Sequence, residues 1–77
     1  MALRTSARNR LPGVVTALTL GDIMAQVSVR VGDNHVVSVI TREAAEDLGL
    51  KEGDEVFVVV KATEVMIAKP SEDASSA

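Results

Sequence analysis

The sequence predicts a mostly β protein: a small five-stranded Greek-key barrel of the OB type, with one short helix between the third and fourth strands. Residues 25–31 alternate strictly between apolar and polar side chains, which is typical of a strand with one face on a core and one in water. Residues 55–61 form an apolar run that is too short and too rich in β-branched side chains for a helix. Thr41 and Gly49 are typical residues for the start and the end of a helix over 42–48.

The first half of the chain contains the signals for three strands. Pro12-Gly13 predicts a turn into a first strand over residues 14–20, which are rich in β-branched side chains. The second strand is the alternating segment, and Gly32-Asp33-Asn34 is a loop of turn-forming residues before a third strand over 36–40. Because that loop is short, the second and third strands should pair antiparallel.

The second half of the chain contains two further strands. Lys51-Glu52-Gly53-Asp54 reads as a turn, and the apolar run over 55–61 is expected to be a central strand. Residues 65–68 are expected to form a last short strand that ends at Lys69-Pro70.

The length of 77 residues allows one domain. We expect a flexible N-terminal arm over 1–5, the folded domain over 6–69 and a disordered, small and polar tail over 70–77. A domain of this size usually needs a disulfide, a metal or a partner chain, and the sequence has no Cys and a single His. With 47% hydrophobic residues, the chain is therefore expected to associate with copies of itself.

The charge pattern favours a small anion as ligand. The net charge is −3, so a general nucleic-acid binder is not expected. Three of the eight basic residues lie in the first ten positions, whereas acidic residues are concentrated in 41–55. No apolar run reaches the roughly 18–20 residues that span a membrane, and no secretory signal is evident, so a cytoplasmic protein without a membrane partner is expected.

Ser6 and Arg8 are two residues apart, so in an extended chain both side chains point to the same face. A hydroxyl beside a guanidinium suits a tetrahedral oxyanion. On their own, most such pairs are simply solvated; likewise Thr41 alone reads as a helix cap and Lys61 as an exposed strand end. The sequence contains no nucleophile elbow, Gly-rich phosphate loop or His–carboxylate pair at helical spacing, so an enzyme is not expected.

Five segments occur in a specific order: Ser6-Ala7-Arg8-Asn9, Gly13-Val14-Val15, Ile40-Thr41-x-Glu43, Leu48-Gly49-Leu50-Lys51-Glu52-Gly53 and Val60-Lys61-Ala62-Thr63-x-Val65-Met66-Ile67-Ala68. Together they resemble the molbindins, small molybdenum-pterin-binding-type proteins whose single domain is also called TOBE. The resemblance covers about residues 5–69. It implies a protein that binds molybdate, or tungstate, as an intact oxyanion for intracellular storage and homeostasis. It also implies a homohexamer, built as a trimer of dimers, with anion sites between subunits.

Carried over position by position, the resemblance implies an oxyanion site with Ser6, Arg8, Lys61 and the backbone amide of Ala62 from one subunit. Thr41 would come from the neighbouring subunit. The chemistry of these groups suits an oxyanion, because two cations would face a dianion and two hydroxyls would donate hydrogen bonds to it. The amides at the start of the helix add further donors.

Residue 44 departs from the family pattern, which often has Ser there and so a second hydroxyl in the first helical turn. Ala44 has no hydroxyl to donate. One hydrogen bond to a charged ligand is worth roughly 1.5–3 kcal/mol, so weaker binding than in relatives is expected. The amide of residue 44 or a water could take the place of the hydroxyl.

Two other functions remain open from the sequence. Residues 48–56 also resemble a segment of the AbrB-like swapped-hairpin transcription factors, which would make the chain a DNA-binding module, although the residues around it are acidic. The barrel could also be an oligomerisation domain without a ligand.

Overall fold

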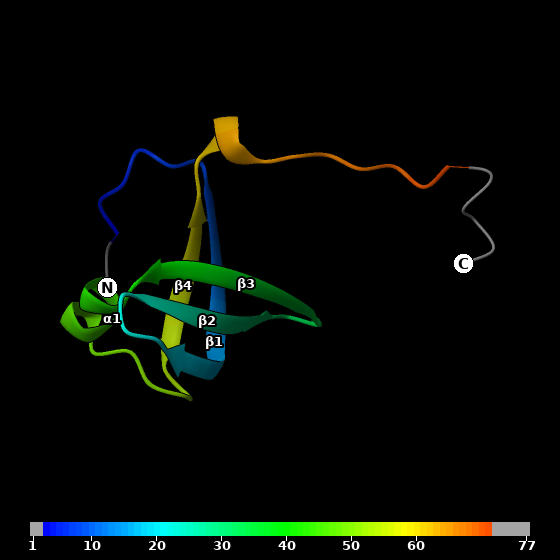
Figure 1. The fold of residues 1–77 in the computed structure, drawn as a ribbon. Helices are drawn as coiled ribbons and strands as arrows, with labels where there is room; N and C mark the ends of the chain where they lie inside the picture. Colours follow the sequence, from blue (N-terminus) through cyan, green and yellow to red (C-terminus); the bar gives the residue numbers. More distant parts are fainter. Residues whose placement is uncertain (1–2, 72–77) are drawn as a thin grey trace.

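The computed structural model describes residues 3–71, which form one curved antiparallel sheet and one short helix (Figure 1). The strand order is β3-β2-β1-β4. The elements are β1 (Asn9–Leu20), β2 (Met24–Val31), β3 (Asn34–Thr41), α1 (Arg42–Leu48), β4 (Glu55–Val60) and a 3₁₀ turn (Ala62–Glu64). The mostly β content and the single helix between the third and fourth strands confirm the predicted class. Parts of the predicted arm (residues 1–2) and tail (residues 72–77) lie outside the described residues.

The core lies on one face of β2, as the alternation predicts. Ala25, Val27 and Val29 are buried, while Gln26 and Arg30 on the opposite face are exposed. Val15 of β1 packs with Val27 and Val29 in the centre of this core. The antiparallel pairing of β2 with β3 is also confirmed, with Val31 opposite Asn34.

The first strand begins five residues earlier than the sequence suggests, and the turn predicted at Pro12-Gly13 is wrong. β1 pairs with β4 over residues 9–14 and with β2 over residues 14–20, so its two halves have different partners. Pro12 lies in the half that is paired with β4 alone. Proline has no N–H to donate, and it is tolerated in a strand that has an unpaired edge.

The helix is where the sequence predicts it. The Thr41 side-chain oxygen accepts a hydrogen bond from the Ala44 amide at 3.1 Å, and Gly49 adopts the left-handed conformation with φ of 63°. Arg42 attaches the helix to the β1–β2 turn, because its amide donates to the Ile23 carbonyl at 2.7 Å. No helix among residues 3–71 is long and apolar enough to cross a membrane.

The five-stranded barrel is not formed, because the described residues contain four strands. Residues 65–68 were expected to be the fifth strand, but they run extended and away from the sheet after the 3₁₀ turn (Figure 1). Their apolar side chains are typical of a strand, but pairing also requires a neighbouring strand edge. Within this chain the 3₁₀ turn directs them away from either free edge.

The prediction that 55–61 is a central strand is also wrong for the described chain. β4 ends at Val60 and stands at the edge of the sheet, where its only partner in residues 3–71 is β1. Val56 and Val58 turn toward the core, whereas Phe57 and Val59 are exposed. The run is apolar on both faces, but the chain itself covers only one of them.

Candidate functional site

The start of β1 and the end of β4 meet at one end of the sheet. Asn9 and Val60 are the last paired residues of the two strands, and the Asn9 Nδ2 donates to the Val60 carbonyl at 3.2 Å. Arg8 directly precedes this pair and Lys61 directly follows it. Two cations that are 53 positions apart in the sequence are therefore held at the same end of the sheet.

Ser6 and Ala62 flank the same end, and all four residues, Ser6, Arg8, Lys61 and Ala62, are exposed. The 3₁₀ turn fixes the chain after Lys61, since the Glu64 amide donates to the Lys61 carbonyl at 2.8 Å. The first amides of a helical turn have no acceptor within the turn, so the Ala62 amide is placed to donate outward. The structure thus groups four of the five predicted site residues at one end of the sheet.

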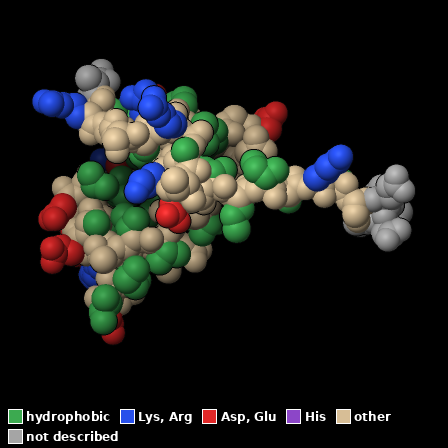
Figure 2. Space-filling view, turned by 90° about the horizontal axis from the view of Figure 1, so that it is seen from above, with side chains coloured by type: hydrophobic (Ala, Val, Ile, Leu, Met, Phe, Trp, Pro, Cys, Tyr) green, Lys and Arg blue, Asp and Glu red, His purple; other side chains and the backbone are tan. Residues whose placement is uncertain are grey.

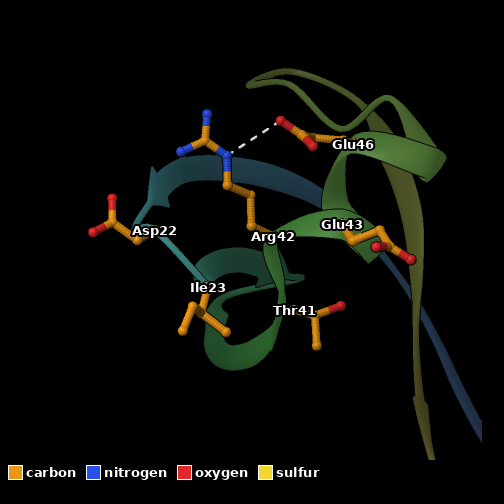
Figure 3. A pocket seen from close by; sticks show the side chains of 6 residues that line it. All are labelled: Asp22, Ile23, Thr41, Arg42, Glu43 and Glu46. Atoms are coloured by element: carbon orange, nitrogen blue, oxygen red, sulfur yellow. Dashed lines mark hydrogen bonds and ion pairs between the residues drawn. The ribbon is translucent and has the colours of Figure 1, made fainter.

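Thr41 is not part of this group. Thr41 is the last residue of β3 and pairs with Met24, the first residue of β2. This position is close to Leu20, at the C-terminal end of β1, whereas Arg8 precedes the N-terminal end of β1. Thr41 lines an open pocket of about 430 Å³ with Asp22, Ile23, Arg42, Glu43 and Glu46, and none of the other predicted site residues lines it (Figure 3). A site that contains all five residues therefore requires a second copy of the chain.

The pocket around Thr41 is acidic. Its lining contains three carboxylates and a single guanidinium, that of Arg42 (Figure 3). This guanidinium is already engaged, because the Arg42 Nε pairs with the Glu46 Oε2 at 3.2 Å and its Nη1 donates to the Gly21 carbonyl at 3.1 Å. An isolated dianion would be repelled here. A cationic end of another copy would be attracted.

The cap geometry determines which donors the helix start can offer. Because the Thr41 oxygen accepts from the Ala44 amide, its own hydrogen is free to donate to a ligand. The Ala44 amide, by contrast, is already used. It cannot replace the missing side-chain hydroxyl at residue 44 unless its bond to Thr41 is broken. A water molecule is therefore the remaining substitute for that hydroxyl.

Arg42 is the pocket residue that the sequence reasoning missed. Its spacing of four from Glu46 is a visible signal for a helical ion pair. Its bond to Gly21 joins residues 21 positions apart, and nothing in the local sequence indicates that contact. Residues 3–71 contain no group of three or more His, Asp or Glu side chains that could hold a metal ion.

Comparison with known proteins identifies relatives over most of the chain. The family model described as TOBE domain matches residues 5–67. Molybdenum-pterin-binding protein 1 of Clostridium pasteurianum is 46% identical over 63 residues, which cover 80% of this chain and 93% of that protein. The molybdenum transport protein ModE of Azotobacter vinelandii is 43% identical over 68 residues, which are 87% of this chain. This chain spans only about a quarter of ModE.

Two solved structures of molybdate-binding proteins have the same fold as this chain. A molybdate-binding protein from Sporomusa ovata superposes with a TM-score of 0.83 at 34% identity, covering 87% of this chain and all of that one. The cytoplasmic molybdate-binding protein ModG superposes with a TM-score of 0.72 at 38% identity, covering 78% of this chain and 43% of that one. Both identities are high enough to indicate common descent as well as a common fold. The chain belongs to the TOBE-domain family of molybdenum-pterin-binding proteins.

Proposed function

We propose that this protein binds molybdate, or tungstate, as an intact oxyanion and serves in cytoplasmic molybdenum storage and homeostasis. The observation that carries the proposal is the pairing of Asn9 with Val60, which holds Arg8 and Lys61 at one end of the sheet. Two cations with the Ser6 hydroxyl and the Ala62 amide nearby suit a tetrahedral dianion. The relatives named above are molybdenum- or molybdate-binding and transport proteins, and none is named as an enzyme.

The complete site is proposed to form between subunits. The basic end of one copy supplies Ser6, Arg8, Lys61 and Ala62, and a neighbouring copy supplies Thr41. Charge complementarity supports this arrangement, because the pocket around Thr41 has an excess of carboxylates. A homohexamer built as a trimer of dimers would present several such sites, and its assembly would cover the apolar residues that the single chain exposes.

Two alternative functions, a DNA-binding module and an oligomerisation domain without a ligand, have less support. The TOBE match over residues 5–67 includes the segment 48–56 that resembles swapped-hairpin DNA-binding proteins, and it accounts for that segment within a longer match. An oligomerisation domain without a ligand would not need two cations at the end of the sheet.

Calorimetric titration of the assembled protein tests the function. Molybdate and tungstate are expected to bind, whereas sulfate at the same ionic strength is expected to bind at least about tenfold more weakly. Sulfate has the same charge but is smaller, so fixed donors cannot all reach it. Equal affinity for sulfate would contradict a molybdate site, and the absence of heat with all three anions would favour the ligand-free alternative.

Substitutions at Thr41 separate helix capping from anion binding. Thr41→Ser keeps the cap and the donating hydrogen, so binding should change little. Thr41→Asp also caps the helix well, but it has no hydrogen to donate and adds a negative charge. We expect Thr41→Asp to retain the unfolding midpoint in urea and to lose molybdate affinity by at least about tenfold in calorimetry. Unchanged affinity in Thr41→Asp would exclude this residue from the site.

A further inference from the structure

Arg42, the first residue of α1, joins the helix to the turn between β1 and β2. This turn is itself closed, because the Gly21 amide donates to the Met24 carbonyl at 2.8 Å. Arg42 binds the turn twice: its amide donates to the Ile23 carbonyl at 2.7 Å, and its Nη1 donates to the Gly21 carbonyl at 3.1 Å. Thr41 directly precedes Arg42, so the backbone at Thr41 is held against the same turn.

Glu46 orients the guanidinium of Arg42 for this contact. The Glu46 Oε2 accepts from the Arg42 Nε at 3.2 Å, one helical turn further along α1. Nε and Nη1 belong to one rigid planar group, so the bond to Glu46 also sets the direction in which Nη1 meets the Gly21 carbonyl. A lysine at this position would have a single ammonium group on a flexible stem and could not fix both bonds in one plane.

The start of α1 needs such support. The helix has seven residues, and Ala45 is the one residue of it that is buried. A helix this short is marginal without contacts to the rest of the protein. At its other end the Leu50 amide donates to the Ala45 carbonyl at 3.1 Å, which leaves the first turn to be held from the side of Arg42.

The Arg42 guanidinium itself is not directed at the anion. Its side chain extends toward Glu46 and away from the side chain of Thr41 (Figure 3). The ion pair also adds little to stability, because the two side chains are 41% and 58% exposed. What the contacts of Arg42 do determine is the position of the helix start.

We propose that Arg42 is a positioning residue for the oxyanion site: it clamps the start of α1 to the β1–β2 turn and thereby fixes the direction in which the Thr41 hydroxyl donates. The inference rests on the proposed function, in which Thr41 donates to an anion that the basic end of a neighbouring copy holds. A binding group has to be kept within about 0.5 Å of its productive position by the contacts around it. The bond from the Ala44 amide fixes the Thr41 oxygen, and Arg42 fixes the backbone that carries it.

The variant Arg42→Lys tests this role, because it keeps the charge and removes the planar group. We expect molybdate affinity to fall by about three- to tenfold in calorimetry, while the urea midpoint changes little. If Arg42 acted only through its charge, lysine would restore the full affinity. Arg30→Lys is the matched control: Arg30 is exposed near the other end of β2 and makes no hydrogen bond or ion pair within residues 3–71, so its affinity should be unchanged.

Amide hydrogen exchange measures the clamp without any ligand. In Arg42→Lys the Ala44 amide, which donates to Thr41, should exchange at least about threefold faster, because the first helical turn opens locally. The Val27 amide in the centre of the sheet should exchange at its original rate, which shows that the fold as a whole is not weakened. An unchanged rate at Ala44 would overturn the clamp.

A double variant shows through which residue Arg42 acts. In the Thr41→Asp background no hydroxyl remains to be positioned, so adding Arg42→Lys should cause no further loss of affinity. A further loss of the same size, or full affinity in Arg42→Lys alone, would overturn the positioning role and leave the proposed function standing. If the unchanged protein bound no molybdate, the proposed function and the positioning role would both be refuted.

Discussion

Replacing Gly13 with Ala is expected to destabilise the protein by about 2–3 kcal/mol, a large fraction of the stability of a small domain. A Cβ at this position would lie 2.6 Å from the Arg30 carbonyl oxygen and 2.7 Å from the Val29 Cγ1. The side chain of Val29 can adjust, but the carbonyl belongs to the backbone of β2. The added methyl group would therefore push β1 and β2 apart where the core begins.

Urea unfolding at a fixed protein concentration measures this effect, because the proposed assembly would make the midpoint depend on concentration. Gly32→Asn is the matched control: Gly32 has a φ of 60° in the β2–β3 turn and open space around its Cβ position, and Asn tolerates that backbone conformation. The control should retain nearly the full stability. If Gly13→Ala unfolds at the same urea concentration as the unchanged protein, β1 and β2 are not as close at Gly13 as the structure shows.

Local patterns in the sequence are sufficient to predict the elements that are stabilised by local contacts. The alternation in β2 predicts which residues are buried, because neighbouring strand residues point to opposite faces. Thr41 and Gly49 predict both ends of α1, because a side-chain acceptor and a residue free to adopt positive φ are local requirements. The tight turn between β2 and β3 follows from Gly32 and Asp33 for the same reason.

The errors concern features that depend on distant parts of the chain. Pro12 reads as a turn residue until one knows that β1 changes its partner at Val14. The apolar run of β4 reads as a central strand, because composition does not specify the position of a strand within its sheet. Residues 65–68 have the composition of a strand, but a strand edge must be available for them.

In the candidate site, too, local spacing predicts some of the arrangement, and the rest depends on distant residues. Ser6 and Arg8 are close in the sequence, so their grouping follows from local spacing alone. Their proximity to Lys61 depends on the pairing of Asn9 with Val60, which only the family resemblance could indicate in advance. The role of Thr41 in a site with Arg8 requires an arrangement of subunits, and no pattern within one chain specifies it.

Replacing Arg8 with Ala is expected to weaken molybdate binding by about tenfold to a hundredfold while the fold is retained. Arg8 is exposed and precedes β1, so its side chain has no part in the core. Its guanidinium can donate two parallel hydrogen bonds to oxygens of one anion, and a hydrogen bond to a charged group is worth roughly 1.5–3 kcal/mol. Calorimetric titration measures the loss, and the urea midpoint verifies that the protein remains folded.

Arg10→Ala is the matched control, because it removes the same charge two residues away at the same end of the sheet. Arg10 lies within β1, paired opposite Val59, and is not a proposed ligand of the anion. Its loss should reduce affinity only through long-range electrostatics, and that reduction should disappear as salt is raised. The loss in Arg8→Ala should persist at high salt, because a directed hydrogen bond is lost as well as a charge. Equal, salt-sensitive losses in both variants would mean that the basic end attracts anions generally and holds no defined oxyanion site.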